Sequence, residues 1–288
     1  MPAYRVSNGM RKSATNPPWT ALQRAFITVI PATVVMILMS CSGLFSTVTT
    51  ELGLGHYAEK RPSWFPEFLP MPLNTIINVG YTLCGLHWCF FIAEANRSGI
   101  VKCNDAFLFF AFNTMGCLYG FVQLYRILFQ TQSSAVIDQW YTLPFFMLVF
   151  VWAETFRGKC SQQKCYKLML ASVSSYLLTL FTSIGFEIAL GCHILIAVTG
   201  AVLLYSKYPS EDTLQYIVLA ILSCTGFVVL KLLDHHLVEL HWIFSYISGH
   251  LLSKICDILQ FHFVNEFFFG MIFNKVLDPA SIDKFKMR

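Results

Sequence analysis

The sequence predicts an all-α polytopic membrane protein with about eight transmembrane helices. Of its 288 residues, 56% are hydrophobic and only 12% are charged, which is too little polar surface to cover a soluble core of this size. Several apolar stretches reach the roughly 20 residues that a helix needs to cross a bilayer. Runs of this length indicate helices, because a membrane barrel shows alternating segments of about 10 residues.

The apolar segments can be placed in order along the chain. They cover residues 25–45, 73–93, 106–129, 140–156, 168–184, 188–205, 214–233 and 249–273. The fifth and sixth are short and separated only by Gly185, Phe186 and Glu187, so we expect a tight hairpin there. The expected organisation is an N-terminal segment (1–24), a first helix (25–45), an outer loop (46–72), a seven-helix membrane core (73–273) and a tail (274–288).

Positive charge predicts the orientation of these helices, because lysine and arginine in short loops favour the cytoplasmic side. With both termini cytoplasmic, 15 of the 20 basic residues lie on that side. Lys60, Arg61 and Arg126 lie on the opposite side, and Lys231 and Lys254 fall inside spans. This asymmetry favours an even number of spans. The basic residues do not gather on one face, so no nucleic-acid partner is expected.

Polar side chains inside the spans are the candidate functional residues, because ionisable groups at membrane depth are unfavourable unless they have a partner or a role. His250, Lys254 and Asp257 recur at i, i+4 and i+7 and therefore share one helix face that must look into the bundle. The candidate cavity residues are Asn74, Asn78, Gln123, Asp138, Asp234, His250, Lys254, Asp257 and His262.

Two simpler interpretations of these residues stay open. Lys254 can form an internal ion pair that orients helices, with Asp257 on its own helix or with Asp138 or Asp234 elsewhere. Asn74 and Asn78 lie one turn apart, and amides in spans usually hydrogen-bond a neighbouring helix.

Several runs resemble a known family. Residues 59–86, 135–144, 185–189 and 222–263 carry the resemblance, and residues 253–263 are the most specific run. On these runs the chain resembles the transmembrane protein 187 family over nearly its whole length. The resemblance implies membrane helices and assigns no chemistry.

A more distant resemblance is to the superfamily of alkaline ceramidases, progestin and adiponectin receptors and Per1-type lipid remodellers. Residues 74–78 are similar to the N-T-x-x-N that opens the ceramidase core, and residues 138–144 resemble its D-E-L-P segment. Asp234 followed by residues 249–254 resembles the final aspartate, hairpin and H-x-x-x-H pair. This resemblance implies a seven-helix ceramidase-like core, preceded here by one extra helix. Hydrolase members of the superfamily hold zinc with three histidines, beside a serine and an aspartate.

The chain departs from that superfamily where the metal chemistry lies. Gln123 stands at the first histidine, Tyr119 or Gly120 at the serine, and Lys254 at the last histidine. Only His250 is retained, and a protonated lysine has no lone pair for zinc. We therefore expect no metal or other cofactor, with an ion pair of Lys254 in the cation's place. His262 and His235 are the remaining candidate donors, on other faces or depths.

Three functions stay open on these observations. The first is non-catalytic binding of a lipid, a sterol or a partner helix in the polar cavity. The second is a metal-dependent lipid amidase or esterase in which Asp138 assists a water, and the third is a proton-coupled transporter. An enzyme needs a complete ligand or nucleophile set, and transporters often show inverted repeats. Neither is evident, so binding of a membrane lipid is favoured; the oligomeric state is left open.

The C-terminal tail yields a prediction about location. Lys284 and Lys286 form a K-x-K-x-x pattern similar to the retrieval signal of endoplasmic reticulum and Golgi proteins. Replacing both lysines with serine is expected to move the protein outward to the plasma membrane, because a receptor no longer recognises the tail. Fluorescence microscopy of tagged protein checks this, and an unchanged location would remove the signal.

Overall fold

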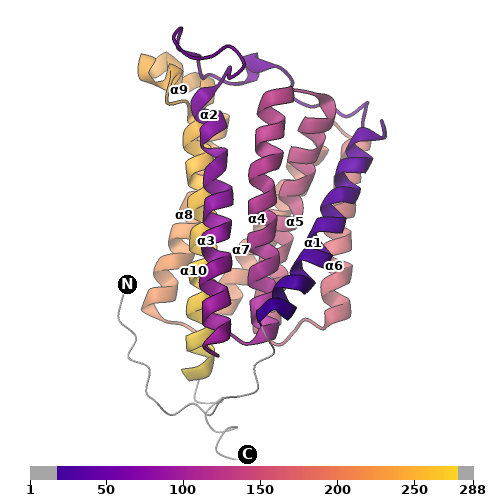
Figure 1. Ribbon diagram of the computed structural model, residues 1–288, viewed down its shortest axis with the longest axis vertical. Coiled ribbons are helices and arrows are strands. Elements are labelled where there is room, and N and C mark those ends of the chain that lie inside the picture. The colour runs from indigo at the N-terminus through magenta and orange to yellow at the C-terminus, as the bar shows by residue number, and fades with distance from the viewer. Residues whose placement is uncertain (1–17, 278–288) are drawn as a thin grey trace, which may run out of the picture.

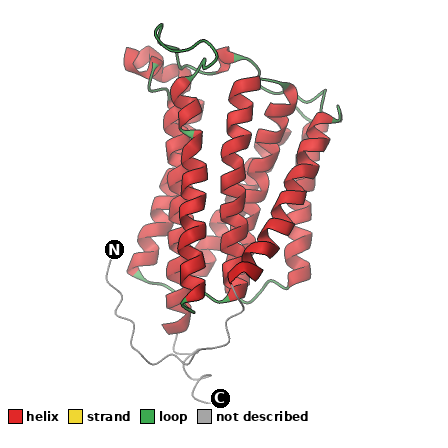
Figure 2. Cartoon of the chain, in the orientation of Figure 1, coloured by secondary structure: helices red, strands yellow, loops and turns green. Residues whose placement is uncertain are grey.

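The computed structural model describes residues 18–277, and within them the chain is a bundle of helices without strands (Figures 1 and 2). The α-helices are α1 (Pro18–Cys41), α2 (Pro72–Ile76), α3 (Asn78–Arg97), α4 (Cys103–Phe129), α5 (Gln132–Phe156), α6 (Gln162–Ser175), α7 (Gly185–Lys207), α8 (Glu211–Leu232), α9 (Asp234–Leu240) and α10 (Gly249–Leu277). Short 3₁₀ helices lie at η1 (Leu54–His56), η2 (Tyr176–Leu180) and η3 (Trp242–Ser245). The predicted all-α class is confirmed.

Seven helical segments of the described chain are long and apolar enough to cross a membrane. They are Thr20–Cys41, Pro72–Arg97, Cys103–Phe129, Gln132–Phe156, Gly185–Lys207, Glu211–Leu232 and Gly249–Lys275. The segment predicted at residues 168–184 corresponds to α6 and η2, of which α6 has only 14 residues. α6 packs on α5, and η2 packs on α7. An eighth span at α6 and η2 stays a prediction.

The hairpin expected at residues 185–187 lies a few residues earlier. Gly185 begins α7, and the turn between η2 and α7 falls at residues 181–184. A Cβ on Gly185 would stand 2.6 Å from the Leu178 carbonyl oxygen, so only glycine allows this close approach. Glu187 then lies in the first turn, where its negative charge is favourable.

Both ends of the described chain lie at one end of the bundle, and the long loop lies at the other. In Figure 1, α1 begins and α10 ends at the lower end, whereas α9 and the long loop between α1 and α2 lie at the upper end. Both ends of the described chain are therefore on one side, the arrangement that an even number of spans requires. The compartment that each end faces stays a prediction.

Helices α4 and α5 are the most enclosed of the candidate spans. Trp152 on α5 stacks on Phe268 of α10 at 4.0 Å, and Phe109 of α4 meets the Trp152 ring edge-on at 4.4 Å. α3 lies close to α4 at Gly120, where a Cβ would stand 2.8 Å from the Asn78 carbonyl oxygen. This close contact brings the upper half of α3 next to the polar residues of α4.

The loop of residues 42–71 is tied to the upper end of the bundle. The Gln132 amide donates to the carbonyl oxygens of Phe45 (3.1 Å) and Val48 (2.7 Å). The Arg126 guanidinium donates to the Glu51 carbonyl oxygen. These contacts hold the loop over the ends of α4 and α5.

Candidate functional site

Four side chains of α4 and α5 form a buried polar group. Gln123 donates to the Asp138 carboxylate and to the Tyr119 hydroxyl, the latter at 2.7 Å. The Tyr119 hydroxyl lies 3.2 Å from Asp138 Oδ1 and 3.3 Å from Thr142 Oγ1. Each helix contributes residues four positions apart, so both pairs point into the contact between the helices. Gln123 and Asp138, both predicted from sequence, are therefore brought together.

Lys254 on α10 is directed at α2 and α3. Lys254 is 4% exposed, and its ammonium donates to Asn78 Oδ1 at 2.9 Å and to the Asn74 carbonyl oxygen at 3.4 Å. Within residues 18–277 no carboxylate oxygen lies within 4.0 Å of it, although Asp138 and Asp257 interact with it at longer range. The expected direct ion pair of Lys254 is thus replaced by an amide contact.

Asp257 has a different partner from the one expected. Its Oδ2 accepts a hydrogen bond from the Tyr81 hydroxyl of α3 at 2.7 Å. Tyr81 meets Tyr119 edge-on with ring centroids 5.1 Å apart, so this contact lies beside the Asp138 group. Sequence reasoning missed Tyr81 because a tyrosine in an apolar helix gives no polar signal.

A second cluster closes the upper end of the bundle. Glu59 from the loop accepts hydrogen bonds from the backbone amides of Leu73 (2.8 Å) and Asn74 (2.9 Å), and from the Asn74 side chain (2.6 Å). Burial raises the pKa of Glu59 above its usual range, and these donors offset part of the rise. Glu59 was not predicted, because an acidic loop residue ordinarily faces water.

Asp234 and His250 belong to this upper cluster and not to the polar group below. The Asp234 carboxylate accepts from the Ala58 and His250 backbone amides, both at 2.9 Å. The His250 ring meets the Tyr57 ring edge-on at 4.5 Å. Asp234 therefore joins the loop, α9 and α10.

His262 stands apart from the other candidates. Its Nδ1 accepts a hydrogen bond from the Trp88 indole at 3.1 Å, and its Nε2 lies 3.7 Å from Glu266. It therefore joins α3 to α10 further down the bundle and does not reach the cavity that the sequence predicted.

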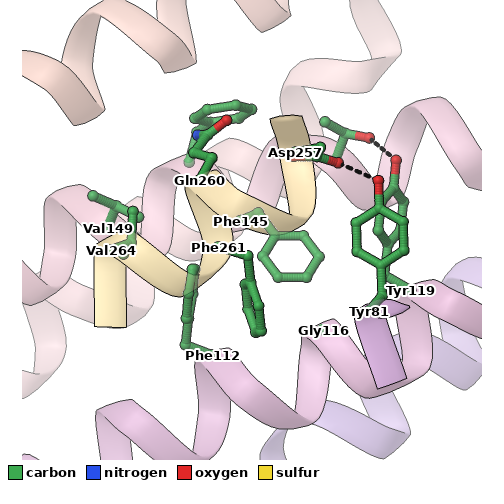
Figure 3. Close-up of a pocket in the computed structure, with 12 residues that line it drawn as sticks. Tyr81, Phe112, Gly116, Tyr119, Phe145, Val149, Asp257, Gln260, Phe261 and Val264 are labelled. Carbon is green, nitrogen blue, oxygen red and sulfur yellow. Dashed lines mark hydrogen bonds between the residues drawn. The ribbon is translucent and has the colours of Figure 1, made fainter. Parts of the chain in front are cut away.

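A pocket opens beside the Asp257 group (Figure 3). It holds about 470 Å³ of empty space, part of it open to the outside of the bundle. Its walls come from α3, α4, α5 and α10; the lining residues are Tyr81, Phe112, Gly116, Tyr119, Thr142, Phe145, Phe146, Val149, Asp257, Gln260, Phe261 and Val264. The hydroxyl and carboxylate oxygens gather at the end where Tyr81 and Asp257 meet, and phenyl rings, Val149, Val264 and the Gln260 amide line the rest. We call this space the head pocket.

A second pocket, the tail pocket, lies next to the head pocket and also holds about 470 Å³ of empty space, part of it open to the outside of the bundle. The two share Phe146, Val149, Gln260 and Val264. The tail pocket lies among α5, α7, α8 and α10; its remaining lining is Ala197, Val198, Ala201, Ile217, Ala220, Ile221, Cys224, Phe267 and Phe268. Apart from Gln260, its lining is apolar.

The residues at the positions of a ceramidase zinc site do not fit a metal. Gln123 is engaged with Asp138, Lys254 donates to Asn78, and the His250 ring packs on Tyr57. Over residues 18–277, no three histidine, cysteine, aspartate or glutamate side chains are grouped so that they can hold a metal ion. Absence of a cofactor stays a prediction.

Membrane-length helices around a buried polar network define a multi-pass α-helical integral membrane protein. Residues 25–269 match the TMEM187 protein family. The chain is 39% identical to transmembrane protein 187 of Homo sapiens over 249 residues, 86% of this chain and 91% of that protein. It is 38% identical to the Bos taurus protein of the same name over 222 residues, 77% and 86% of the two chains. No solved structure matches.

The chain therefore belongs to the transmembrane protein 187 family, as its sequence resemblance predicted. The more distant ceramidase-like resemblance is not among these matches and stays a prediction.

Glu59 predicts a pH-dependent stability. Because its folded pKa is raised, folding favours the protonated form. Its contribution is therefore complete below the ordinary glutamate pKa of about 4.3 and declines as the pH rises through the folded value. Thermal unfolding in detergent should show wild type losing stability relative to Glu59→Gln as the pH rises from about 4 to about 8. A difference between the two proteins that is constant over this range would contradict the prediction.

The Lys254 contact predicts a non-additive pair of substitutions. Asn78→Leu leaves the buried ammonium with only its longer hydrogen bond and should lower the free energy of unfolding by about 2–3 kcal/mol. Adding Lys254→Met removes the charge and should restore most of that loss. Equilibrium unfolding in mixed micelles measures both effects. If the double variant is less stable than Asn78→Leu alone, the ammonium is not what Asn78 stabilises.

Proposed function

We propose that this protein binds an amphipathic membrane lipid inside its bundle, without catalysing a reaction. The observation that carries the proposal is the adjacency of the head and tail pockets, which share four lining residues, one pocket being polar at its end and the other apolar. The polar group of the lipid lies at Asp257, and its hydrocarbon chain lies in the tail pocket.

The polar end of the head pocket provides the contacts for a lipid's polar group. Tyr81, Tyr119, Thr142 and Asp257 present hydroxyl and carboxylate oxygens there. Polar atoms at membrane depth are unfavourable unless they are satisfied, since no bulk water reaches them. A ligand that carries its own polar group adds to the hydrogen bonds that these groups already make with one another, and it excludes water at the same time.

The tail pocket suits a hydrocarbon chain because small side chains leave room there. Ala197 and Ala201 on α7 and Ala220 on α8 are among its lining residues. A hydrocarbon chain that moves from the bilayer into the tail pocket exchanges one apolar environment for another. The polar group of the lipid therefore supplies the specificity.

The arrangement of the helices supports entry of a lipid from the side. α10 packs closely along α8, and α5 packs closely along α7. The two pockets lie between these pairs, where α5 and α10 meet through side chains such as the stacked Trp152 and Phe268 and their backbones lie further apart than within each pair. A small movement of one pair away from the other opens this space to the bilayer, while the packing within each pair is kept.

The proposal includes the compartment. We place the protein in the endoplasmic reticulum or Golgi membrane, a placement supported by Lys284 and Lys286, which lie outside the described residues.

Filling the junction of the two pockets tests the proposal. Val149 is 8% exposed and lines both pockets, so Val149→Phe should reduce the lipid that co-purifies with the protein about tenfold. Val79→Phe is the matched control, because Val79 is 54% exposed on α3 and lines neither pocket. The measurement is lipid per mole of detergent-purified protein by mass spectrometry.

Either of two results would contradict lipid binding in these pockets. One is equal lipid content in the Val149→Phe and Val79→Phe proteins. The other is a lipid profile in the wild type that matches the bulk membrane, since a specific site enriches one class.

A further inference from the structure

We infer that the head pocket selects an amphiphile whose polar group is a protonated amine. This inference rests on the proposed lipid binding and names the chemical class of the ligand. It depends on unpaired acceptors, surrounding aromatic rings and the positions of the nearby charges.

The first observation is an open acceptor on Asp257. Its Oδ2 is engaged with Tyr81, whereas its Oδ1 has no hydrogen-bond partner among residues 18–277. Oδ1 is not fully enclosed by protein atoms. Part of its surface is therefore open to the pocket that Asp257 lines. No lysine, arginine or histidine nitrogen of the described chain lies within 4.0 Å of this carboxylate. An ionised carboxylate only accepts hydrogen bonds, so the missing partner is a donor.

The second observation lies one turn further along α10. Gln260 lines both pockets, and its Oε1 is enclosed without a partner. Asp257 and Gln260 are three residues apart and therefore share a face of the helix, as Figure 3 shows. Because the Gln260 Oε1 is fully enclosed, it meets a ligand only after its amide turns toward the pocket; an ammonium, which carries several hydrogens, then satisfies both acceptors.

Aromatic rings supply the rest of the head pocket. Phe112 stacks on Phe261 with centroids 4.7 Å apart, and Phe145 meets Phe261 edge-on at 6.2 Å. Because the faces of Phe112 and Phe261 cover each other, the rings act mainly by excluding water, which strengthens the attraction between a carboxylate and a cation. The combination of a carboxylate and phenyl rings favours an organic cation over a neutral alcohol.

The positive charges of the protein do not occupy this place. Lys254 is directed away to Asn78, and Lys231 of α8 interacts with Asp257 only at longer range. Asp138 adds a second carboxylate near the Asp257 end. A carboxylate or phosphate ligand would meet this negative charge. A bare metal ion needs several oxygen ligands, which phenyl rings do not provide.

The test uses three photoactivatable alkyl probes of equal chain length that end in an amine, a carboxylic acid or an alcohol. The full chain is labelled in phosphatidylcholine vesicles, and the amount of bound probe is measured. We expect the amine to label the wild type about tenfold more than the acid. Asp257→Asn should lower labelling by the amine probe about tenfold. Asp257→Glu should still label more with the amine than with the acid.

The outcomes separate this inference from the lipid-binding proposal. If the three probes label the wild type equally and Val149→Phe abolishes all labelling, the pocket binds lipid but does not select an amine. If Val149→Phe and Val79→Phe both label like the wild type, lipid binding in these pockets fails as well. The comparison of probes on the wild type requires no variant, so it decides the inference even where Asp257→Asn does not fold.

Discussion

The hydrogen bond from Lys254 to Asn78 sets how α10 lies against α3, and the other polar contacts depend on that register. Three residues further along both helices, Asp257 accepts from Tyr81 at 2.7 Å. Equal spacing on the two helices means that one contact aligns the next. The ammonium is almost completely enclosed, so a slip of one residue would leave a buried charge without a partner.

This register also produces the division between the two polar clusters. Below the Lys254 contact, the Asp257 carboxylate reaches the head pocket. Above it, Glu59 and Asp234 join the loop and α9 to the ends of α2 and α10. The upper cluster consists mostly of backbone amides held by carboxylates, which is a structural arrangement. The lower cluster faces empty space, which is where a ligand has room.

Much of the fold follows from the sequence, and the site follows only in part. Apolar length predicts where most membrane-length helices lie, and the spacing of Lys254 and Asp257 predicts one shared helix face, on which Lys254 is buried and Asp257 contacts Tyr81. Helical spacing gives the face of a helix but not the neighbour it meets. Lys254 therefore donates to the Asn78 amide oxygen instead of to a carboxylate. His262 accepts a hydrogen bond from Trp88 lower in the bundle.

The residues that the sequence did not reveal share a physical reason. Tyr81 and Gln260 are polar only at their tips and pass unnoticed in apolar helices. Glu59 is part of a loop whose burial depends on contacts with α2, which no local pattern encodes. The wider separation between the backbones of α5 and α10 likewise depends on how all the helices pack together.

The pairing of α3 with α10 has a consequence for biosynthesis. Asn78 and Lys254 are 176 positions apart in the sequence, so α3 enters the membrane long before its partner is made. The last span is the least apolar of the seven candidates, and it carries Lys254 and Asp257 in its first three turns, where charged side chains oppose insertion, though less than at the helix centre. We therefore expect stable insertion of α10 to depend on α3 that is already in the membrane. If a defect in α3 kept α10 out of the bilayer, the C-terminus would end on the wrong side of the membrane.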